Sequence, residues 1–283
     1  RFISHPTRYF TQRRLKAYLS LREEEEREDE PFALDGLAGY QLREALLQAM
    51  LKGDEATFIE RLSLTGELPY GALGRLSLQK SRSQCQQLFT ALQGYSLEEC
   101  EPIEVNLSLG SILLQTWLDR PTATTRLSYR IGDLSAHQKM QVWIEHLALC
   151  AQGTPKQHHL INLSKTGKLL QHGFILISPD EAKEHLTNML ALLQQGLCQP
   201  LALPAKTADA WCKSYCSSKT EGDADTAWEQ ALKIYQENSS AFSNSEVDDA
   251  YWQRYYPDLN DQKDNFVAMF EVIWLPMHRH LEV

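Results

Sequence analysis

The chain has 283 residues, of which 43% are hydrophobic and 23% are charged, and its formal net charge is −9 at pH 7. This length and composition predict a globular protein with a sizeable buried core, and no apolar run approaches the roughly 20 residues that span a bilayer. The acidic charge argues against a surface that binds nucleic acid throughout, because phosphate binding depends on Lys and Arg. The first residue is not Met and no signal-peptide pattern follows it, so we expect a fragment of a longer chain.

Six cysteines are present without a Cys-x-x-Cys pair, which favours free thiols in a reducing, cytoplasmic compartment. Cys212 and Cys216 have the i, i+4 spacing of half a helical metal site, but no matching pair accompanies them, and we interpret them as buried structural thiols. The pairs His158-His159 and His278-x-His280 lack the spacing of a helical zinc site, so we interpret them as surface histidines. The sequence therefore predicts neither a metal nor a cofactor.

Positive charge is concentrated near the start of the chain. A helix is predicted from about residue 6 to residue 20, because Pro6 suits a first helical turn and the following residues continue at helical spacing. It contains four basic residues, Arg8, Arg13, Arg14 and Lys16, which we predict to supply any contact with DNA or a partner. The acidic run EEEEREDE at 23–30 is interpreted as a solvated loop, with mimicry of DNA phosphates as the weaker alternative.

The chain as a whole is expected to divide into three parts. Helices are predicted at 39–52, 55–64 and 72–92, so that residues 1–101 form a helical part. Residues 102–200 are predicted to be an α/β core with strands at 103–109, 112–118, 124–131, 160–163 and 169–177, a helix at 134–151 and another that opens at Ser178. A hairpin turn is predicted at Asp119-Arg120-Pro121, between the second and third strands. The part 201–283 is helical again, with helices at 208–216, 226–236, 247–255 and 262–280.

The aromatic and apolar residues of the last part predict packing. Apolar residues recur at helical spacing through 262–280, which indicates a packed helix whose last turn is kinked by Pro276. Four aromatic residues, Tyr251, Trp252, Tyr255 and Tyr256, lie close together before it. We interpret them as core or interface residues rather than as a platform for unpaired bases, because no basic stripe accompanies them.

Five stretches resemble one known family. They are His5-Pro6-x-Arg8-x-Phe10-x-Gln12-x-Arg14-Leu15, EPFALDGL at 30–37, Gly66-x-Leu68-Pro69-Tyr70-Gly71-Ala72-x-Gly74, Met140-Gln141-x-Trp143-x-Glu145-His146-Leu147 and Tyr251-Trp252-Gln253-Arg254. On these residues the chain resembles, over essentially its whole length, the C-terminal domain of the RecC family, the gamma subunits of RecBCD helicase-nucleases (exodeoxyribonuclease V). The resemblance implies an α/β fold with a PD-(D/E)xK nuclease-like core, in which a mixed central sheet has flanking helices, and with helical additions at both ends.

The resemblance also indicates where a nuclease site has degenerated. Nucleases of this type hold Mg²⁺ with carboxylates on successive strands, with a Lys two residues after the second, because hard oxygen ligands bind the ion that activates water. The resemblance places Leu113 and Ser128 where the related nuclease domain of the partner subunit has these carboxylates, and Arg130 where it has the Lys. The next helix keeps Gln141 and has Trp143 in place of a Tyr. Leu and Ser do not replace carboxylates as ligands, so we expect no metal and no catalysis at this place.

The resemblance implies a non-catalytic domain that scaffolds RecB-like and RecD-like helicase subunits in a heterotrimer and helps to guide DNA strands in double-strand-break repair and recombination. Two alternatives stay open: an active metal-dependent exonuclease that uses displaced carboxylates such as Asp119 or Asp133, and a scaffold without DNA contact. Both aspartates adjoin turn residues, which favours surface turns. Related subunits that bind an iron–sulfur cluster open with Cys-Pro, whereas this chain has His5-Pro6, which argues against a cluster. No phosphate-binding loop of an ATPase occurs in the sequence.

Overall fold

The computed structural model describes residues 1–19, 36–66, 68–95, 101–119, 125–164, 166–236 and 245–282. The acidic run at 23–30 lies outside these residues, as does most of the turn predicted at 119–121. Within them the protein is mixed α/β, with eleven α-helices and two β-sheets. None of the helices in this part of the chain is long and apolar enough to cross a membrane.

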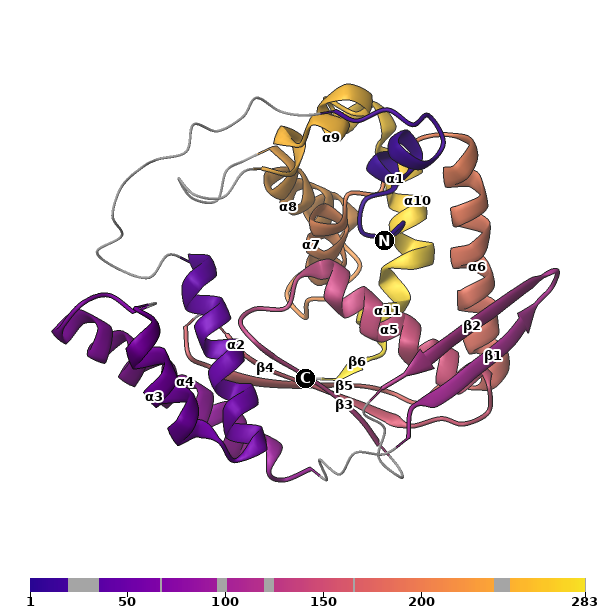
Figure 1. Ribbon diagram of the computed structural model, residues 1–283. Coiled ribbons are helices and arrows are strands. Elements are labelled where there is room, and N and C mark those ends of the chain that lie inside the picture. The colour runs from indigo at the N-terminus through magenta and orange to yellow at the C-terminus, as the bar shows by residue number, and fades with distance from the viewer. Residues whose placement is uncertain are drawn as a thin grey trace.

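A four-stranded mixed sheet lies at the centre of the molecule (Figure 1). Its strands are β3 (Thr125–Ile131), β4 (Gln157–Leu163), β5 (Leu169–Phe174) and β6 (Leu281–Glu282), in that order. β3 and β4 are parallel and are joined by helix α5 (Ala136–Ala151), whereas β5 and β6 add antiparallel strands. A parallel pair needs such a crossover, and the helix covers the face of the sheet that it crosses. The predicted strands 160–163 and 169–177 are present with shifted ends.

The two faces of β3 differ in character because alternate side chains of a strand point to opposite sides. Leu127 and Ile131 join a buried cluster with residues of α2 (Gly36–Lys52) and α4 (Ala72–Leu92), the two helices that cover one face of the sheet. α3 (Glu55–Thr65) connects them. The alternate residues Arg126, Ser128 and Arg130 start from the other face, where Arg126 meets α5, whereas the side chain of Arg130 reaches around the edge of the sheet to Tyr40 of α2.

The first two strands form a sheet of their own. β1 (Ile103–Leu109) pairs antiparallel with β2 (Ile112–Leu118) across a tight turn at Gly110, whose φ of 63° suits a residue without a Cβ. The hairpin predicted between the second and third strands is therefore wrong, because in the described residues β2 pairs with β1 while β3 pairs with β4. Alternation identified the strands, but it holds no information on which strands pair.

The first helix is shorter than predicted. α1 (Pro6–Arg13) ends well before residue 20, and Lys16 has a φ of 56°, which a continuing right-handed helix does not allow. The apolar residues that would extend its buried face, Leu15 and Tyr18, are 55% and 77% exposed. These two side chains gain little burial that would hold a longer helix, and most of a helix's stability comes from packing its apolar face.

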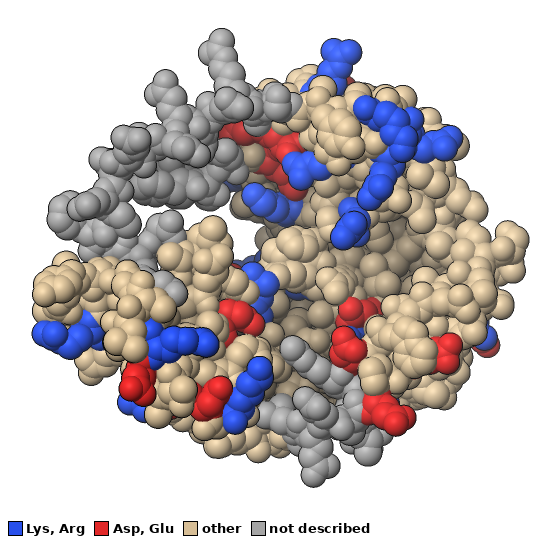
Figure 2. Space-filling model, in the orientation of Figure 1, with Lys and Arg blue, Asp and Glu red and all other residues tan. Residues whose placement is uncertain are grey.

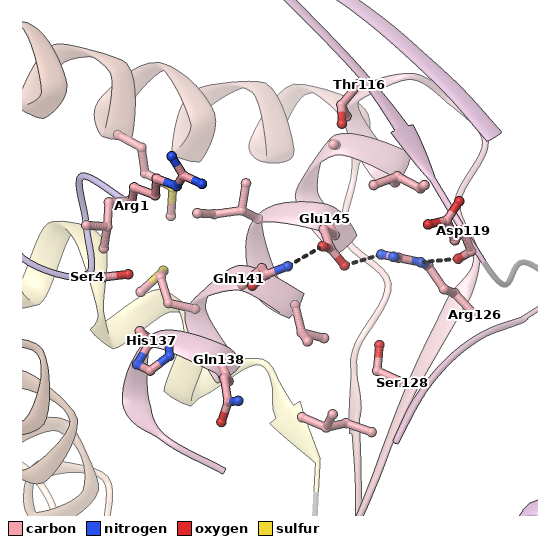
Figure 3. Close-up of a pocket in the computed structure, with 18 of the residues that line it drawn as sticks. Arg1, Ser4, Thr116, Asp119, Arg126, Ser128, His137, Gln138, Gln141 and Glu145 are labelled. Atoms are coloured by element: carbon pink, nitrogen blue, oxygen red, sulfur yellow. Dashed lines mark hydrogen bonds and ion pairs between the residues drawn. The ribbon is translucent and has the colours of Figure 1, made fainter. Parts of the chain in front are cut away.

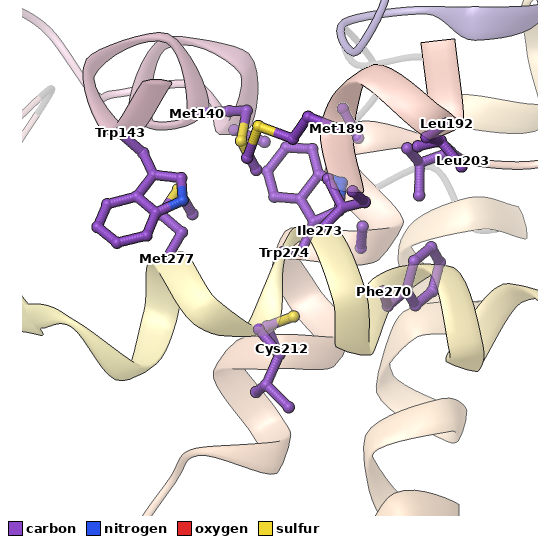
Figure 4. Packing of buried hydrophobic residues seen from close by; sticks show 14 of the residues in the cluster. Met140, Trp143, Met189, Leu192, Leu203, Cys212, Phe270, Ile273, Trp274 and Met277 are labelled. Atoms are coloured by element: carbon purple, nitrogen blue, oxygen red, sulfur yellow. The ribbon is translucent and has the colours of Figure 1, made fainter. Parts of the chain in front are cut away.

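The helices after the sheet build the largest core (Figure 4). They are α6 (Pro179–Cys198), α7 (Ala205–Tyr215), α8 (Ala224–Gln236), α9 (Ala250–Tyr255), α10 (Lys263–Ile273) and α11 (Leu275–Arg279). The predicted helix 262–280 breaks at Trp274, just before Pro276, which confirms the predicted kink as a division into α10 and α11. Its apolar face is buried as predicted, since Phe266, Phe270, Trp274 and Met277 are each 0% exposed.

Two predicted surface histidines are not at the surface. His158 is fully buried beneath α5, and His278 is nearly so, with its Nε2 3.0 Å from Oδ1 of Asp209. Burial raises the pKa of Asp209, but the His278 hydrogen bond and the ammonium groups of Lys139 and Lys213 outweigh it and hold that pKa far below its usual range. This buried cluster joins α5, α7 and α11. Histidine is a polar residue type, which suggested exposure, but contacts with residues distant in sequence bury both side chains.

The prediction of two buried thiols at Cys212 and Cys216 is correct for only one of them. Cys212 is buried, whereas its neighbour Cys216 is exposed, so the expectation of buried structural thiols holds for the first and is wrong for the second. Burial raises the pKa of the Cys212 thiol far above its ordinary value, which keeps it protonated. Tyr251 and Trp252 are buried and Tyr255 and Tyr256 are half-buried, in agreement with their interpretation as packing residues.

Candidate functional site

An open cleft of about 930 Å³ lies along β3, the edge strand of the four-stranded sheet, beside α5 (Figure 3). Its floor is formed by β3 and α5, and its walls come from β2, α6, the first residues of the chain and the beginning of α2. Ser128, Arg130 and Gln141, three of the four positions predicted from the resemblance, line it. The local reason is simple: β3 presents every second residue to this side, and α5 follows β3 after a short connection.

An ion pair occupies the middle of the cleft. The guanidinium of Arg126 on β3 contacts the carboxylate of Glu145 on α5 through Nη1 and Oε2, and its Nε donates to the backbone oxygen of Asp119 at 3.2 Å. Gln141 donates from Nε2 to the other carboxylate oxygen of Glu145 at 3.1 Å, as Figure 3 shows. The two charged side chains are only 9% and 18% exposed. The carboxylate that α5 contributes to the cleft, that of Glu145, is therefore already neutralised by Arg126.

Ser128 is hydrogen-bonded to buried His158 on β4, with 2.9 Å between Oγ and Nε2. Burial lowers the pKa of His158 well below its ordinary value, so the imidazole is neutral at pH 7 and has a single N–H. Its Nδ1 has no hydrogen-bond partner among the described residues. Because a buried N–H without an acceptor is rarer than a buried acceptor without a donor, we assign the proton to Nε2, donating to Ser128.

This arrangement does not activate a nucleophile. A serine is activated when the imidazole accepts its proton and a carboxylate orients the imidazole from the other nitrogen. With the proton assigned to Nε2, this nitrogen donates to Ser128 at 2.9 Å, and no described carboxylate contacts Nδ1 of His158. Because the Ser128 oxygen accepts from the imidazole, its own O–H is available as a donor to the cleft.

Arg130, two residues further along β3, is half-buried, and its Cζ lies 5.0 Å from the centre of the Tyr40 ring. This distance is that of a cation–π contact. Its Nε is buried without a hydrogen-bond partner, and no carboxylate of the described residues forms an ion pair with it. The hydroxyl of Tyr40 donates to Oε2 of Glu44 at 3.3 Å. Of the two arginines that β3 contributes to the cleft, Arg126 is paired with a described carboxylate and Arg130 is not.

The remaining predicted positions lie elsewhere. Leu113 is 54% exposed, is opposite Ser108 in the β1–β2 hairpin, and does not line the cleft, which its neighbour Leu114 does. Asp119 is exposed at the rim of the cleft, and Asp133 is exposed outside it. In the part of the chain that the structure describes, no three His, Cys, Asp or Glu side chains converge as a metal site would require.

Of the four basic residues predicted in the first helix, two make contacts within the protein and two are exposed without such contacts among the described residues. The guanidinium of Arg8 contacts Asp249 and lies 5.3 Å from the ring centre of Tyr251, while Arg14 donates from Nε to the backbone oxygen of Leu197 at 2.9 Å. These two arginines hold α1 against α9 and the end of α6. Arg13 and Lys16 are exposed. Figure 2 shows that Lys and Arg side chains gather over the part of the molecule where Figure 1 places α1.

His5 begins this helix as a structural residue. Its Nδ1 accepts from the backbone N–H of Arg8 at 3.2 Å, its Nε2 lies 3.0 Å from Oδ1 of Asp249, and its ring stacks on Trp252 at 4.6 Å. Burial raises the pKa of Asp249, but the hydrogen bonds from His5 and from the backbone N–H of Tyr251, together with the charge of Arg8, lower it to about 2. Both ring nitrogens of His5 are thus engaged within the protein.

Sequence reasoning missed Arg126, Glu145 and His158 as parts of the site. Arg126 has a signal in hindsight, since it is two residues before Ser128 and must share its face of β3. Glu145 is one α-helical turn after Gln141, which places both on one side of α5. His158 offers no local signal, because only the parallel register of β3 and β4 brings it opposite this part of β3.

Comparison with known proteins identifies the family. The RecBCD enzyme subunit RecC of Escherichia coli strain K12 is 28% identical over 287 residues, which cover 99% of this chain and 25% of that protein. The subunit of the same name from Buchnera aphidicola subsp. Schizaphis graminum is 21% identical over 269 residues, covering 93% and 25%. The one from Mycolicibacterium smegmatis is 25% identical over 198 residues, covering 69% and 18%. The chain thus spans a quarter or less of the length of these relatives. The family model of the RecC C-terminal domain matches residues 1–216, and the chain therefore belongs to the RecC C-terminal domain family.

Proposed function

We propose that this chain is a non-catalytic, nuclease-like domain of a RecC subunit, which scaffolds RecB-like and RecD-like helicase subunits and helps to guide DNA strands in a cytoplasmic repair and recombination complex. The observation that carries the proposal is the content of the cleft. Where a nuclease of the PD-(D/E)xK type needs carboxylates around an ion, β3 contributes the hydroxyl of Ser128 and the guanidinium groups of Arg126 and Arg130 to this cleft, and the carboxylate of Glu145 on α5 is already paired with Arg126. Positive groups repel a divalent cation, and a serine hydroxyl is a weak neutral ligand.

The nuclease-like core is part of the proposal. It is supported by the unit β3–α5–β4, which places Ser128 and Arg130 on a strand beside Gln141 on the following helix, the order that the resemblance implies. The exposed position of Leu113 speaks for a core in which the β1–β2 hairpin has moved away from a metal-binding role. We further propose the division into parts 1–101, 102–200 and 201–283, with the middle part as the nuclease-like core.

The geometry gives little support to the alternative of a metal site built from other carboxylates, such as Asp119 or Asp133. Asp119 is the one predicted alternative ligand at the cleft, and the carboxylate of Glu145, which shares the contact with Arg126, is held by this arginine. Recruiting Glu145 to a metal would break this largely buried ion pair. Leaving one charge of such a pair uncompensated costs about 3–5 kcal/mol, which a weak site does not recover.

The test combines metal binding with cleavage. A real Mg²⁺ site with a dissociation constant near ~0.1 mM stabilises the fold by roughly 2.7 kcal/mol at ~10 mM metal. We expect no difference in melting temperature between Mg²⁺ or Mn²⁺ and chelator, and no degradation of linear single- or double-stranded DNA by the purified subunit. A metal-dependent rise, with cleavage abolished by Asp119→Ala or Asp133→Ala, would overturn the proposal. Failure of the subunit to copurify with RecB-like and RecD-like partners would overturn its scaffolding part.

A further inference from the structure

Arg130 presents an electrostatic problem that the described residues do not solve. A half-buried charge is costly unless an opposite charge or a set of hydrogen bonds compensates it. The ring of Tyr40 offers a cation–π contact, but Nε of Arg130 remains without an acceptor. A buried polar group left unsatisfied in this way commonly marks the place of a missing ion or water.

The chemistry around Arg130 selects an anion. Ser128 is two residues away on the same strand, and with His158 Nε2 assigned as the donor of their 2.9 Å hydrogen bond, the O–H of Ser128 is left to donate to the cleft. Of the described carboxylates that line the cleft, Glu145 contacts Arg126 and Glu44 accepts from the hydroxyl of Tyr40, while Asp119 is exposed at the rim and forms no ion pair with Arg130. An arginine donor group and a serine O–H therefore remain to serve an acceptor from outside the protein.

We propose that the cleft is a phosphate site, in which Arg130 and Ser128 bind the oxygens of one phosphate group where a nuclease of this fold would hold its metal. A planar guanidinium matches the oxygens of phosphate, and stacking on Tyr40 holds it in place before the ligand arrives, which reduces the entropic cost of binding. The cleft is open and about 930 Å³ in volume, which admits a nucleotide of a single DNA strand as well as free phosphate. The DNA source rests on the proposed function, whereas the phosphate chemistry does not.

The experiment uses the complete subunit in complex with its partner subunits. Phenylglyoxal modifies arginine, and its rate at each site is followed by peptide mass spectrometry with chloride, with inorganic phosphate at equal ionic strength, or with a 20-nucleotide oligothymidylate. Arg75, which is exposed on α4, is the control within the same molecule. We expect phosphate or the oligonucleotide to slow modification of Arg130 about tenfold and to leave Arg75 unchanged.

A pair of variants covers the case in which Arg130 reacts too slowly to follow. Arg130→Gln and Arg75→Gln remove the same charge, so a general effect of phosphate on stability is equal in both. We expect inorganic phosphate to raise the melting temperature of the wild type and of Arg75→Gln more than that of Arg130→Gln, with Ser128→Ala intermediate. With oligothymidylate, Arg130→Gln should reduce the slope of log affinity against log salt by roughly 0.7, the value for one phosphate contact on a single strand.

The outcomes separate the two proposals. If neither phosphate nor oligothymidylate protects Arg130, and Arg130→Gln responds to phosphate as the wild type does, the phosphate site is refuted even where the complex binds DNA. If phosphate protects Arg130 and the complex binds no DNA, the phosphate site stands and the strand-guiding function fails. Protection by the oligonucleotide beyond that by free phosphate assigns the site to the DNA backbone.

Discussion

The ion pair between Arg126 and Glu145 yields the sharpest prediction on stability. Replacing Glu145 by Gln leaves the guanidinium of Arg126, which is 9% exposed, without its opposite charge. Removing one partner of a buried pair costs about 3–5 kcal/mol, and the partial exposure of Glu145 places the expected value near the lower end, about 3 kcal/mol. For a chain of this size that loss corresponds to a decrease in melting temperature of roughly 6–12 °C.

The double variant Arg126→Met/Glu145→Leu removes both charges and fills similar volume. Apolar replacement of a whole buried pair is often neutral or stabilising, so we expect its free energy of unfolding to lie within about 1 kcal/mol of the wild type. Denaturant unfolding of wild type, Glu145→Gln, Arg126→Met and the double variant measures the coupling directly. The pair of Lys263 and Asp225 is the control, because Asp225 is 88% exposed, and Asp225→Asn should cost less than about 1 kcal/mol. Additive effects of the two single changes would refute the reasoning.

Three further predictions follow from other parts of the molecule. Reversing the charge of exposed Arg13 and Lys16 should reduce both the affinity of the complex for fork DNA and its salt dependence, and unchanged values would remove α1 as a contact surface. Truncation at Asp261 removes the buried face of α10 and α11 and should abolish cooperative unfolding, which an unaltered thermal transition would contradict. Burial lowers the pKa of His146 in the folded protein to about 4. As the pH falls below 6.5, the unfolded chain is protonated at His146 before the folded protein is, so the free energy of unfolding should fall by about 3 kcal/mol between pH 6.5 and pH 4. Urea unfolding should show a smaller loss for His146→Gln, and an equal loss would exclude this residue as the cause.

Sequence patterns correctly predicted those features that depend only on residues close together in the chain. The alternation from Ile103 to Leu109 predicted β1 residue for residue, and the apolar spacing through α10 predicted the face that is buried. Pro276 predicted the break before α11, because a proline cannot continue the hydrogen bonding of the preceding turn. In each case the physical cause lies within a few residues of its effect.

Partners distant in sequence were not predictable. The burial of His158 depends on α5 and on the register of β4 with β3. The charge of Glu145 on α5 is neutralised by Arg126, which lies on the preceding strand β3. The position of Leu113 relative to Ser128 depends on which strands pair, and alternation is the same whether β2 joins β1 or β3. The resemblance identified Ser128, Arg130 and Gln141 as neighbours, but only the three-dimensional arrangement distinguishes a balanced arginine from an unbalanced one.

The strand β6 has a consequence for how the molecule folds. It pairs with Gly173 and Phe174 of β5, although all helices from α6 to α11 lie between the two strands in the chain. Closing so long a loop is entropically costly and slow, so the central sheet is expected to gain its last strand only after these helices have packed. Until then this end of β5 is an open edge on which another chain can add. During synthesis, this end of β5 would therefore remain open to aggregation until residues 281–282 have been added. The helices α6 to α11 postpone the pairing of β6 with β5, and their packing then places β6 on the open edge.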